Sequence, residues 1–321
     1  MPLICSFLIR LWVFAVMASL SVCVAAADSN VLQPRITGDW WQVAGNPDLG
    51  TLTTTRQQPV DFGIWQAADG TWQIWSCIRG TKEPGKNRLF YGWQGAHLTD
   101  TNWTPMGISM QANTNYAEVQ GGLQAPSVIF SGGRFWMFYG DWNDICYATS
   151  TDGKQFTRVL NARGKSALFS ESAGSNARDP EVINIGGVWH CYYNAHPHGI
   201  GGDYCRTSLD LTNWSASTLV ACGGQSGSTT GSAECPFVVQ LGPRQFYLFR
   251  TQHYGRRAQT SVYFSENPLD FGVNHDEGHF VCTLPVAAPE IVQHNGEWFI
   301  AVLLPDLKGI HISHLTWDKA D

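Results

Sequence analysis

The sequence predicts an all-β protein, a five-bladed β-propeller with four antiparallel strands in each blade. Three observations predict it. One motif recurs five times along the chain, most copies are followed by further short strand-like runs, and both glycine (33 residues) and aromatic residues (12%) are plentiful. Short strands rich in aromatic residues and joined by glycine-containing turns are typical of all-β repeat folds.

The repeated motif begins with a small or acidic residue, which we call the opening position of the blade. Apolar residues, a glycine-containing turn and a second run led by aromatic residues follow it. In chain order the copies are DFGIWQAADGTWQIWS from Asp61, which is the weakest, APSVIFSGGRFWMFYG from Ala125, DPEVINIGGVWHCYYN from Asp179, CPFVVQLGPRQFYLFR from Cys235 and APEIVQHNGEWFIAVL from Ala288. The starts lie 64, 54, 56 and 53 residues apart, a period typical of propeller blades.

A third and a fourth strand are predicted after the two strands of the motif. Runs such as ICYATSTDGKQFTRV and DYCRTSLDLTNWSAS contain a strand, a polar turn and an aromatic residue that starts another strand. A β-sandwich also has many short strands, but it would not repeat one motif at a near-constant period. The fifth unit stops after three runs, so we expect the segment around residues 37–43 to supply its outer strand and close the ring.

The N-terminal 27 residues have the features of a signal peptide. Arg10 precedes an apolar run, Leu11 to Val24, which ends in three alanines. The run is shorter than the ~20 residues of a spanning helix. We therefore expect an exported protein, periplasmic or secreted, whose residues 28–321 form a single propeller domain with no membrane attachment after cleavage.

Composition and cysteine spacing exclude several other classes of protein. A net charge of −6 gives no support for nucleic-acid binding, which favours a basic face. Seven cysteines follow residue 27 without the paired spacing of a zinc site. Most are expected to be small buried residues, although Cys191 and Cys205 lie on strands predicted to be neighbours and could form a disulfide. We expect a monomer that requires no cofactor.

The opening positions carry carboxylates in three of the five blades. The first strand of a blade lines the central channel, so Asp61, Asp179 and Glu234, which directly precedes Cys235, are predicted to converge at one mouth. Crowding and desolvation raise carboxyl pKa values, so that one acid stays protonated while another is ionised. Glycosidic bond cleavage uses such a pair. We therefore predict that these three residues are catalytic.

Further polar and aromatic residues are predicted at the same mouth as substrate-binding residues. Most of them lie where second strands end, and Glu290 lies two residues into its strand on the side of the opening residue. The predicted set is Arg79, Asp141, Trp142, Arg178, His196, Arg250, His253 and Glu290. Trp65 and Trp142 are candidates for stacking on sugar rings. A single carboxylate at a strand start is often only a turn residue, but the shared register favours chemistry.

At these positions the sequence resembles the five-bladed propeller glycoside hydrolases of families 43 and 32. Arg178-Asp179-Pro180 and Glu234-Cys235-Pro236 match the RDP and ECP signatures of family 32, and also fit the DP and E-x-P elements of family 43. The resemblance covers roughly residues 61–317, judged by the repeat. It implies that Asp61 is a general base or nucleophile, Asp179 a third carboxylate that tunes the acid and orients the sugar, and Glu234 the general acid.

The sequence also departs from both families. The family 32 motif WMNDPNG is absent, no residues remain for its C-terminal β-sandwich, and Asp61 is followed by Phe62 instead of proline, which makes Asp48 an alternative. We expect a divergent member nearer to family 43, inverting and acting on arabinose- or xylose-containing chains. A retaining fructosidase like those of family 32 and a non-catalytic sugar-binding propeller are the alternatives. The resemblance allows a structural calcium, but no ligand set is visible.

Overall fold

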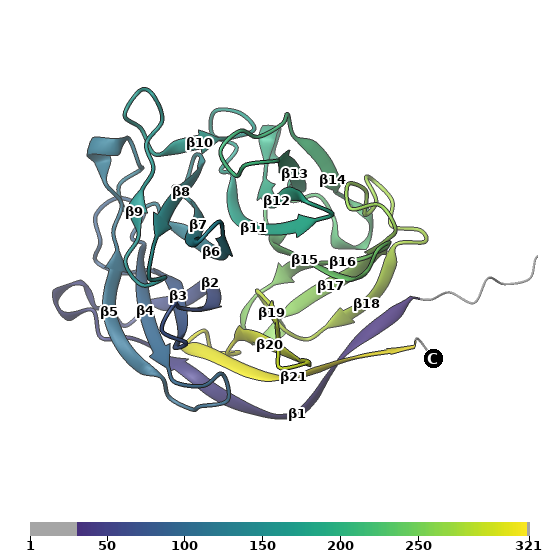
Figure 1. The fold of residues 1–321 in the computed structure, drawn as a ribbon, viewed down its shortest axis with the longest axis horizontal. Helices are drawn as coiled ribbons and strands as arrows, with labels where there is room; N and C mark the ends of the chain where they lie inside the picture. Colours follow the sequence, from purple (N-terminus) through teal and green to yellow (C-terminus); the bar gives the residue numbers. More distant parts are fainter. Residues whose placement is uncertain (1–30, 320–321) are drawn as a thin grey trace, which may run out of the picture. The chain divides into compact units, whose positions relative to one another are not determined.

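Five antiparallel sheets are arranged around a common axis in the computed structural model, which describes residues 31–319 (Figure 1). Each sheet is one blade, as the repeat predicts. The signal peptide predicted over residues 1–27 lies outside the described residues. Within residues 31–319, no helix is long and apolar enough to cross a membrane.

The strands of each blade follow one another outward from the axis. The first blade contains β2 (Gln58–Gln66), β3 (Trp72–Arg79), β4 (Leu89–Gly95) and β5 (Thr104–Met110). The second contains β6 (Gln124–Ser131), β7 (Arg134–Gly140), β8 (Ile145–Ser150), β9 (Thr157–Arg158) and β10 (Ala167–Phe169). The third contains β11 (Arg178–Ile185), β12 (Val188–Ala195), β13 (Gly202–Ser208) and β14 (Thr218–Ala221).

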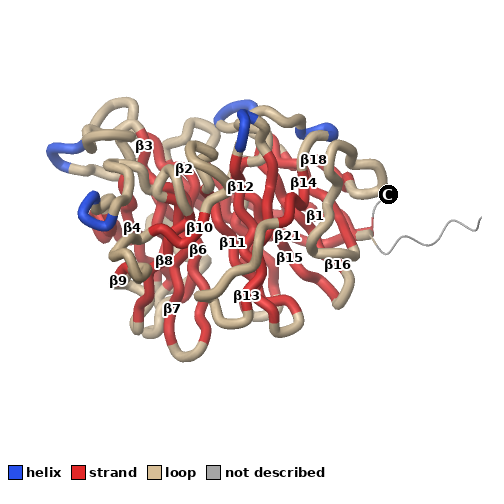
Figure 2. Tube along the Cα trace, turned by 90° about the horizontal axis from the view of Figure 1, so that it is seen from above, coloured by secondary structure: helices blue, strands red, loops and turns tan. Residues whose placement is uncertain are grey.

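The fourth blade contains β15 (Glu234–Gly242), β16 (Gln245–His253), β17 (Gln259–Ser265) and β18 (Phe280–Leu284). The fifth contains β19 (Glu290–His294), β20 (Glu297–Leu303), β21 (Gly309–Lys319) and β1 (Leu32–Gly45). Five 3-10 turns lie in loops: Gly50–Leu52, Thr114–Tyr116, Pro197–Gly199, Gly224–Ser226 and Gly255–Arg257. Seen from the side, loops join the strands at both ends of the blades (Figure 2).

The five opening positions share one unusual backbone conformation. Their φ angles are positive: 37° at Asp61, 37° at Ala125, 54° at Asp179, 48° at Cys235 and 49° at Ala288. Residues other than glycine seldom adopt this conformation. In four blades the ladder between the first and second strands shifts register at this point, which is the signature of a β-bulge. The recurrence confirms that the motif copies are structurally equivalent.

The ring closes between the two ends of the described chain. β1 pairs antiparallel with β21, with Ile36 opposite Leu315, and forms the outer strand of the fifth blade. Residues 37–43 lie within β1, so the predicted closure is confirmed. The hydroxyl of Tyr247 in the fourth blade accepts a hydrogen bond from the Leu32 amide at 2.7 Å. This bond attaches the start of β1 to the neighbouring blade.

The cysteines after residue 27 are free thiols, and all but Cys235 are buried. The considered pairing of Cys191 with Cys205 is not formed, although their strands are neighbours. Cys191 lies opposite Arg206, and Cys205 lies opposite Tyr192. Because successive residues point to opposite faces of a sheet, the two thiols lie on different faces of the blade, where they pack in separate apolar clusters.

Candidate active site

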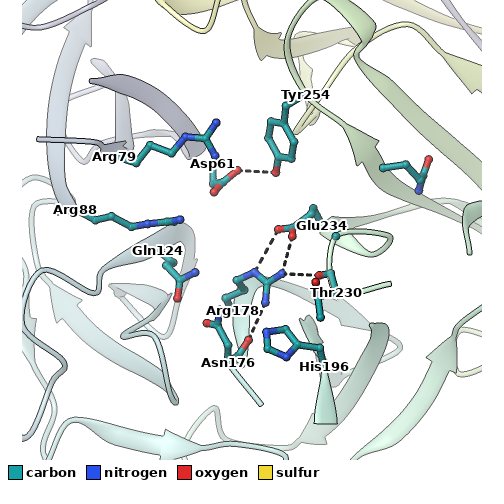
Figure 3. A pocket seen from close by; sticks show the side chains of 12 residues that line it. Asp61, Arg79, Arg88, Gln124, Asn176, Arg178, His196, Thr230, Glu234 and Tyr254 are labelled. Carbon is teal, nitrogen blue, oxygen red and sulfur yellow. Dashed lines mark hydrogen bonds and ion pairs between the residues drawn. The ribbon is translucent and has the colours of Figure 1, made fainter. Parts of the chain in front are cut away.

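A polar cavity of about 360 Å³ is lined by residues of the first four blades (Figure 3). Its wall contains two carboxylates, three guanidinium groups and one imidazole. The lining residues are Asp61, Arg79, Arg88, Gln124, Asn176, Arg178, His196, Thr230, Gly231, Glu234, Gln252 and Tyr254. A narrower space, lined by residues of all five inner strands, shares Asp61 with it and continues along the axis. The cavity is therefore at a mouth of the central channel.

Asp61 reaches the cavity from the bulge of β2. Its Oδ1 accepts a hydrogen bond from the Tyr254 hydroxyl at 2.8 Å and a weaker one from the Cys235 thiol at 3.3 Å. Within residues 31–319, the other oxygen, Oδ2, accepts no hydrogen bond. One oxygen of the carboxylate is thus held in place, while the other is free to act on a ligand or a water molecule.

Glu234, directly before the bulge of β15, forms a bidentate ion pair with Arg178. Arg178 Nε and Nη2 donate to its carboxylate oxygens at 3.2 and 2.6 Å. Burial acts to raise the pKa of Glu234, but the attraction and hydrogen bonds of Arg178 outweigh it and hold that pKa below its usual range. The side chain keeps 18% of its surface exposed. Glu234 is therefore ionised and reachable from the cavity.

Asp179 lies behind these two residues and is only 3% exposed. Its Oδ2 accepts hydrogen bonds from Asn194 Nδ2 at 3.1 Å and from the Cys235 amide at 3.2 Å, whereas its buried Oδ1 has no partner among the described residues. Burial raises the pKa of Asp179 well above its usual range, and the nearby charges of Asp61 and Glu234 raise it further. Among the three carboxyl groups, Asp179 is therefore the one whose surroundings most favour the protonated form.

Three predicted substrate-binding residues line the cavity. These are Arg79, Arg178 and His196. Arg79 Nε donates to Gln58 Oε1 at 3.0 Å, and the Arg79 guanidinium lies 5.9 Å from the centre of the Tyr254 ring. In the view of Figure 3 the His196 ring lies next to Arg178. Arg79 and His196 reach the cavity from the ends of second strands, whereas Arg178 reaches it from the start of β11.

Asp141 and Trp142 lie beside the cavity and do not line it. Asp141 Oδ1 accepts hydrogen bonds from the amides of Asn143 and Asp144 at 3.0 and 2.7 Å, so its carboxylate holds the turn after β7. The Trp142 ring contacts Arg88, whose guanidinium lies 5.0 Å from the ring centre. Trp142 thus supports a residue that lines the cavity.

Arg250, His253 and Glu290 are not brought to the cavity. Arg250 is buried two residues before Gln252 on β16, where its Nε lies 2.5 Å from an Asp203 carboxylate oxygen. His253 is exposed, because strand alternation turns its neighbour Gln252 toward the cavity instead. Glu290 lies deeper in the channel near Glu181. These three placements differ from the predicted substrate contacts.

Two further candidates have structural roles and take no part in the cavity. Asp48 is exposed and accepts hydrogen bonds from the Gly50 amide and the Thr53 hydroxyl, each at 2.9 Å, so it holds a turn and the carboxylate in the cavity is Asp61. Trp65 is buried and donates its indole N–H to the Gly153 carbonyl at 2.8 Å. It is therefore part of the core and cannot stack on a sugar.

Seven lining residues were missed by the sequence prediction: Arg88, Gln124, Asn176, Thr230, Gly231, Gln252 and Tyr254. Gln124 had a signal, because it directly precedes an opening position just as Arg178 and Glu234 do. Gln252 and Tyr254 flank the predicted His253 at the end of β16, so the place was predicted but the direction of the side chains was not. The other four lie outside the repeated motif, where nothing in the repeat marks them.

Asp61, Asp179 and Cys235 bring two carboxylate oxygens and a thiol sulfur within 4.8 Å of one another. Calcium takes roughly six to eight oxygen ligands. Two carboxylates and a sulfur do not fit that requirement, so this cluster does not provide the calcium site that the family resemblance allows.

No protein-family model and no curated protein matches this sequence. Solved structures match it at low identity. A thermostable family-43 glycoside hydrolase has a TM-score of 0.59 at 17% identity, with 82% of this chain and 90% of that one covered. An endo-arabinase from Bacteroides thetaiotaomicron has a TM-score of 0.61 at 15% identity, with 86% and 98% covered.

A third match is a family-32 β-fructofuranosidase mutant of Bombyx mori in complex with sucrose. Its TM-score is 0.57 at 17% identity, with 81% of this chain covered but only 56% of the silkworm enzyme. The chain thus spans little more than half the length of that protein. At such identities the matches show the fold. This chain has the five-bladed propeller fold of the family 43 and family 32 glycoside hydrolases, at a divergence that leaves little sequence in common.

Proposed function

We propose that the protein is an exported glycoside hydrolase whose active site is the polar cavity lined by residues of the first four blades. One observation carries the proposal. Asp61 and Glu234 come from different blades and line one polar cavity, with the buried carboxyl group of Asp179 next to both. Cleavage of a glycosidic bond needs one carboxyl group that gives a proton and another that acts at the anomeric carbon. The propeller fold shared with glycoside hydrolases supports this proposal.

The cavity also has unused hydrogen-bond acceptors. Gln124 Oε1 and Asn176 Oδ1 are buried and have no partner among the described residues, although both side chains line the cavity. Buried polar atoms are nearly always hydrogen-bonded in complete structures. We assign these atoms to the hydroxyl groups of a bound sugar, which is rich in donors.

In this proposal Asp61 is the general base and Glu234 the general acid. Asp179 carries the proton that Glu234 needs until substrate binds. Without ligand, Arg178 keeps Glu234 ionised. A sugar that draws hydrogen bonds from Arg178 weakens this ion pair, and the pKa of Glu234 then rises toward that of a proton donor. Substrate binding would thereby shift the proton from Asp179 to Glu234.

We further propose an inverting reaction on arabinose- or xylose-containing chains, as in family 43. The family resemblance and the similar fold of the endo-arabinase support this choice. A retaining fructosidase reaction like that of family 32 is the alternative. NMR of the first-formed product anomer separates the two mechanisms, because inversion and retention give opposite anomers.

The test of the catalytic assignment uses Asp61→Asn and Glu234→Gln on a panel of aryl glycosides, arabinans, xylans and fructans. Each variant should lower kcat about a thousandfold, in the range of lost general acid–base catalysis, with an unchanged circular dichroism spectrum. Asp48→Asn is the matched control and should keep full activity. Near-normal turnover by Glu234→Gln would refute the assignment.

A non-catalytic sugar-binding propeller is the second candidate, and the ion pair between Arg178 and Glu234 favours it, because an ionised Glu234 has no proton to give. Binding of a polysaccharide without any product release would support this candidate. Export is tested separately, by N-terminal sequencing of the mature protein, which should begin at Asp28. We also propose a monomer, which light scattering on the purified protein tests.

A further inference from the structure

We propose that the cavity binds a sugar bearing an anionic group, a carboxylate or a sulfate ester, through Arg79 and Arg88. The inference deepens the proposed function, on which it rests for the reaction, by naming the substrate class. A neutral arabinose or xylose unit does not require this pair of guanidinium groups.

The balance of charge in the cavity is the first observation. The cavity is lined by Arg79, Arg88 and Arg178 but by only two carboxylates, Asp61 and Glu234. The whole chain carries a net charge of −6. A cationic cavity in an acidic protein is a local feature, and it would attract an anionic ligand.

The second observation is that two of these arginines have no ion-pair partner. Arg178 forms a bidentate ion pair with Glu234. Arg79 and Arg88 form no ion pair with any carboxylate of residues 31–319. Arg79 Nε donates to a neutral amide, Gln58 Oε1, and Arg88 Nη1 lies 3.8 Å from the Cys77 sulfur. Most of their N–H donors therefore remain available to a ligand.

The third observation is how close the two arginines are along the sheet. Arg79 ends β3 and Arg88 directly precedes β4, and Ile78 pairs with Leu89 in the antiparallel ladder. Arg79 and Arg88 therefore occupy the next pair of facing positions. Like charges that face one another across strands are unfavourable. Both side chains nevertheless extend into the cavity toward its centre (Figure 3), and a bound anion would remove their repulsion.

Contacts around Arg88 hold its side chain in position without pairing it directly with a carboxylate of the described residues. The Trp142 ring lies 5.0 Å from its guanidinium and 4.6 Å from the Lys86 ammonium. Cation–π contacts of this kind orient a guanidinium while its N–H groups stay free. A planar guanidinium can donate two parallel hydrogen bonds to the oxygens of a carboxylate or sulfate. Arg79 and Arg88 can therefore bind an anionic substituent of a sugar.

The experiment compares glycans that differ only in the anionic group. The probes are polygalacturonate, glucuronoxylan and alginate with their carboxyl-reduced forms, and a sulfated galactan with its desulfated form. Binding is measured by isothermal titration calorimetry on wild type, Arg79→Gln, Arg88→Gln and Arg88→Lys. Arg134→Gln is the control, because Arg134 is exposed and lies at the start of β7. The other end of β7, Gly140, pairs with the lining residue Gln124, so Arg134 is a whole strand length away from the site.

Wild type should bind at least one anionic glycan about ten to a hundred times more tightly than its neutral form, as for a hydrogen bond between charged groups. Arg88→Gln and Arg79→Gln should remove most of that preference, because they should weaken binding of the anionic form much more than binding of the neutral form. Arg88→Lys should keep part of the preference for the anionic form, because the positive charge remains but the bidentate hydrogen bonding of the guanidinium is lost. The pair of glycans that shows the preference identifies whether the site recognises a carboxylate or a sulfate ester.

Several outcomes would overturn the inference. One is that wild type binds the anionic and the neutral form of every glycan pair with equal affinity. Another is that Arg88→Gln lowers the affinity for both forms by the same factor, which would mean that Arg88 only supports the structure of the site. Hydrolysis of neutral glycans without such a preference would leave the proposed function standing alone. Tight, arginine-dependent binding of an anionic glycan without hydrolysis would support the inference and contradict the proposed function.

Discussion

At the scale of the residue, buried carboxyl groups link the stability of this protein to pH. Asp141 is 2% exposed, and burial raises its pKa to about 6, although the amides of Asn143 and Asp144 act in the opposite direction. The unfolded chain loses this proton near pH 4, whereas the folded protein keeps it. The contribution of Asp141 to stability therefore falls as pH rises from about 4 to about 6 and is constant above that.

Asp141→Asn removes this loss, because an amide cannot ionise but can still accept the two backbone hydrogen bonds. Between pH 4 and pH 7 the free energy of unfolding of the variant should rise relative to wild type by up to about 3 kcal/mol, from about 1.4 kcal/mol per pKa unit. Urea unfolding at both pH values measures it. The exposed residue Asp39 provides the control Asp39→Asn. An equal difference at the two pH values would contradict the linkage.

Tyr254 is a second residue whose contribution can be isolated. Burial raises its pKa well above the usual range, so its hydroxyl stays a neutral donor to Asp61 Oδ1 at 2.8 Å. Tyr254→Phe keeps the ring beside Arg79 and removes only the hydroxyl, which also lies 3.3 Å from the Cys235 sulfur. On the substrate found with the glycan panel we expect kcat/KM to fall about tenfold or more, as for a hydrogen bond to a charged group. Unchanged kinetics would mean that the Asp61 orientation depends on other contacts.

The repeat predicted where the carboxylates lie but not how their charges are arranged. Asp61, Asp179 and Glu234 could be placed from sequence because a fixed position in each blade leads to the same mouth. The bond of Tyr254 to Asp61 joins residues 193 positions apart, and the ion pair of Arg178 with Glu234 joins two blades. Such pairings depend on side-chain conformations, for which a strand pattern carries no signal.

At the scale of the element, a buried ion pair fastens the loop before β6 to the second blade. The Glu118 side chain is fully buried. Its carboxylate accepts hydrogen bonds from Arg158 Nε at 2.6 Å, Arg158 Nη2 at 2.8 Å and the Tyr139 hydroxyl at 2.7 Å. Arg158 belongs to the two-residue strand β9, so this contact holds a very short element against the sheet.

Removing one partner of this group should destabilise the protein strongly, because the remaining charge stays buried and unpaired. We expect Glu118→Gln to lower the free energy of unfolding by about 3 kcal/mol or more, measured by chemical denaturation. The exposed pair of Arg244 and Glu266 supplies the comparison, and Glu266→Gln should change stability little. A similar effect of the two substitutions would show that burial of the Glu118 pair is unimportant.

Inner strands were easier to predict than outer ones. Inner strands contain the repeated motif, and their apolar residues pack against neighbouring blades. The outer edge of the second blade is instead divided between β9 and β10, which both pair with β8. The pattern after Phe156 indicated the first of these strands, but nothing indicated Ala167–Phe169. An edge strand pairs on one side and faces solvent on the other, so its sequence is less constrained.

At the scale of the whole molecule, stability depends on one contact between the two ends of the described chain. β1 and β21 pair along most of their length, from Leu32 opposite Lys319 to Gly45 opposite Gly309. Every other blade is built from consecutive strands, whereas the fifth combines β19, β20 and β21 with β1. The fifth blade is therefore complete only when the N-terminal strand has returned to it.

A chain that begins at Asn46 tests this closure. It would lack β1, which would leave β21 as a long unpaired edge and expose Leu315 and the other apolar residues that β1 covers. Unpaired edges of this length promote aggregation, and the lost strand also removes the bond from the Leu32 amide to Tyr247 in the next blade.

We expect this chain to melt at least roughly 10 °C lower than wild type, on the order expected when several kcal/mol of stability are lost, or to be recovered only as aggregate. A chain that begins at Val31 keeps β1 whole and should melt like the chain that begins at Asp28, in thermal scans followed by near-ultraviolet circular dichroism. If both shortened chains melt at the same temperature, then the first three strands of the fifth blade close the ring without β1.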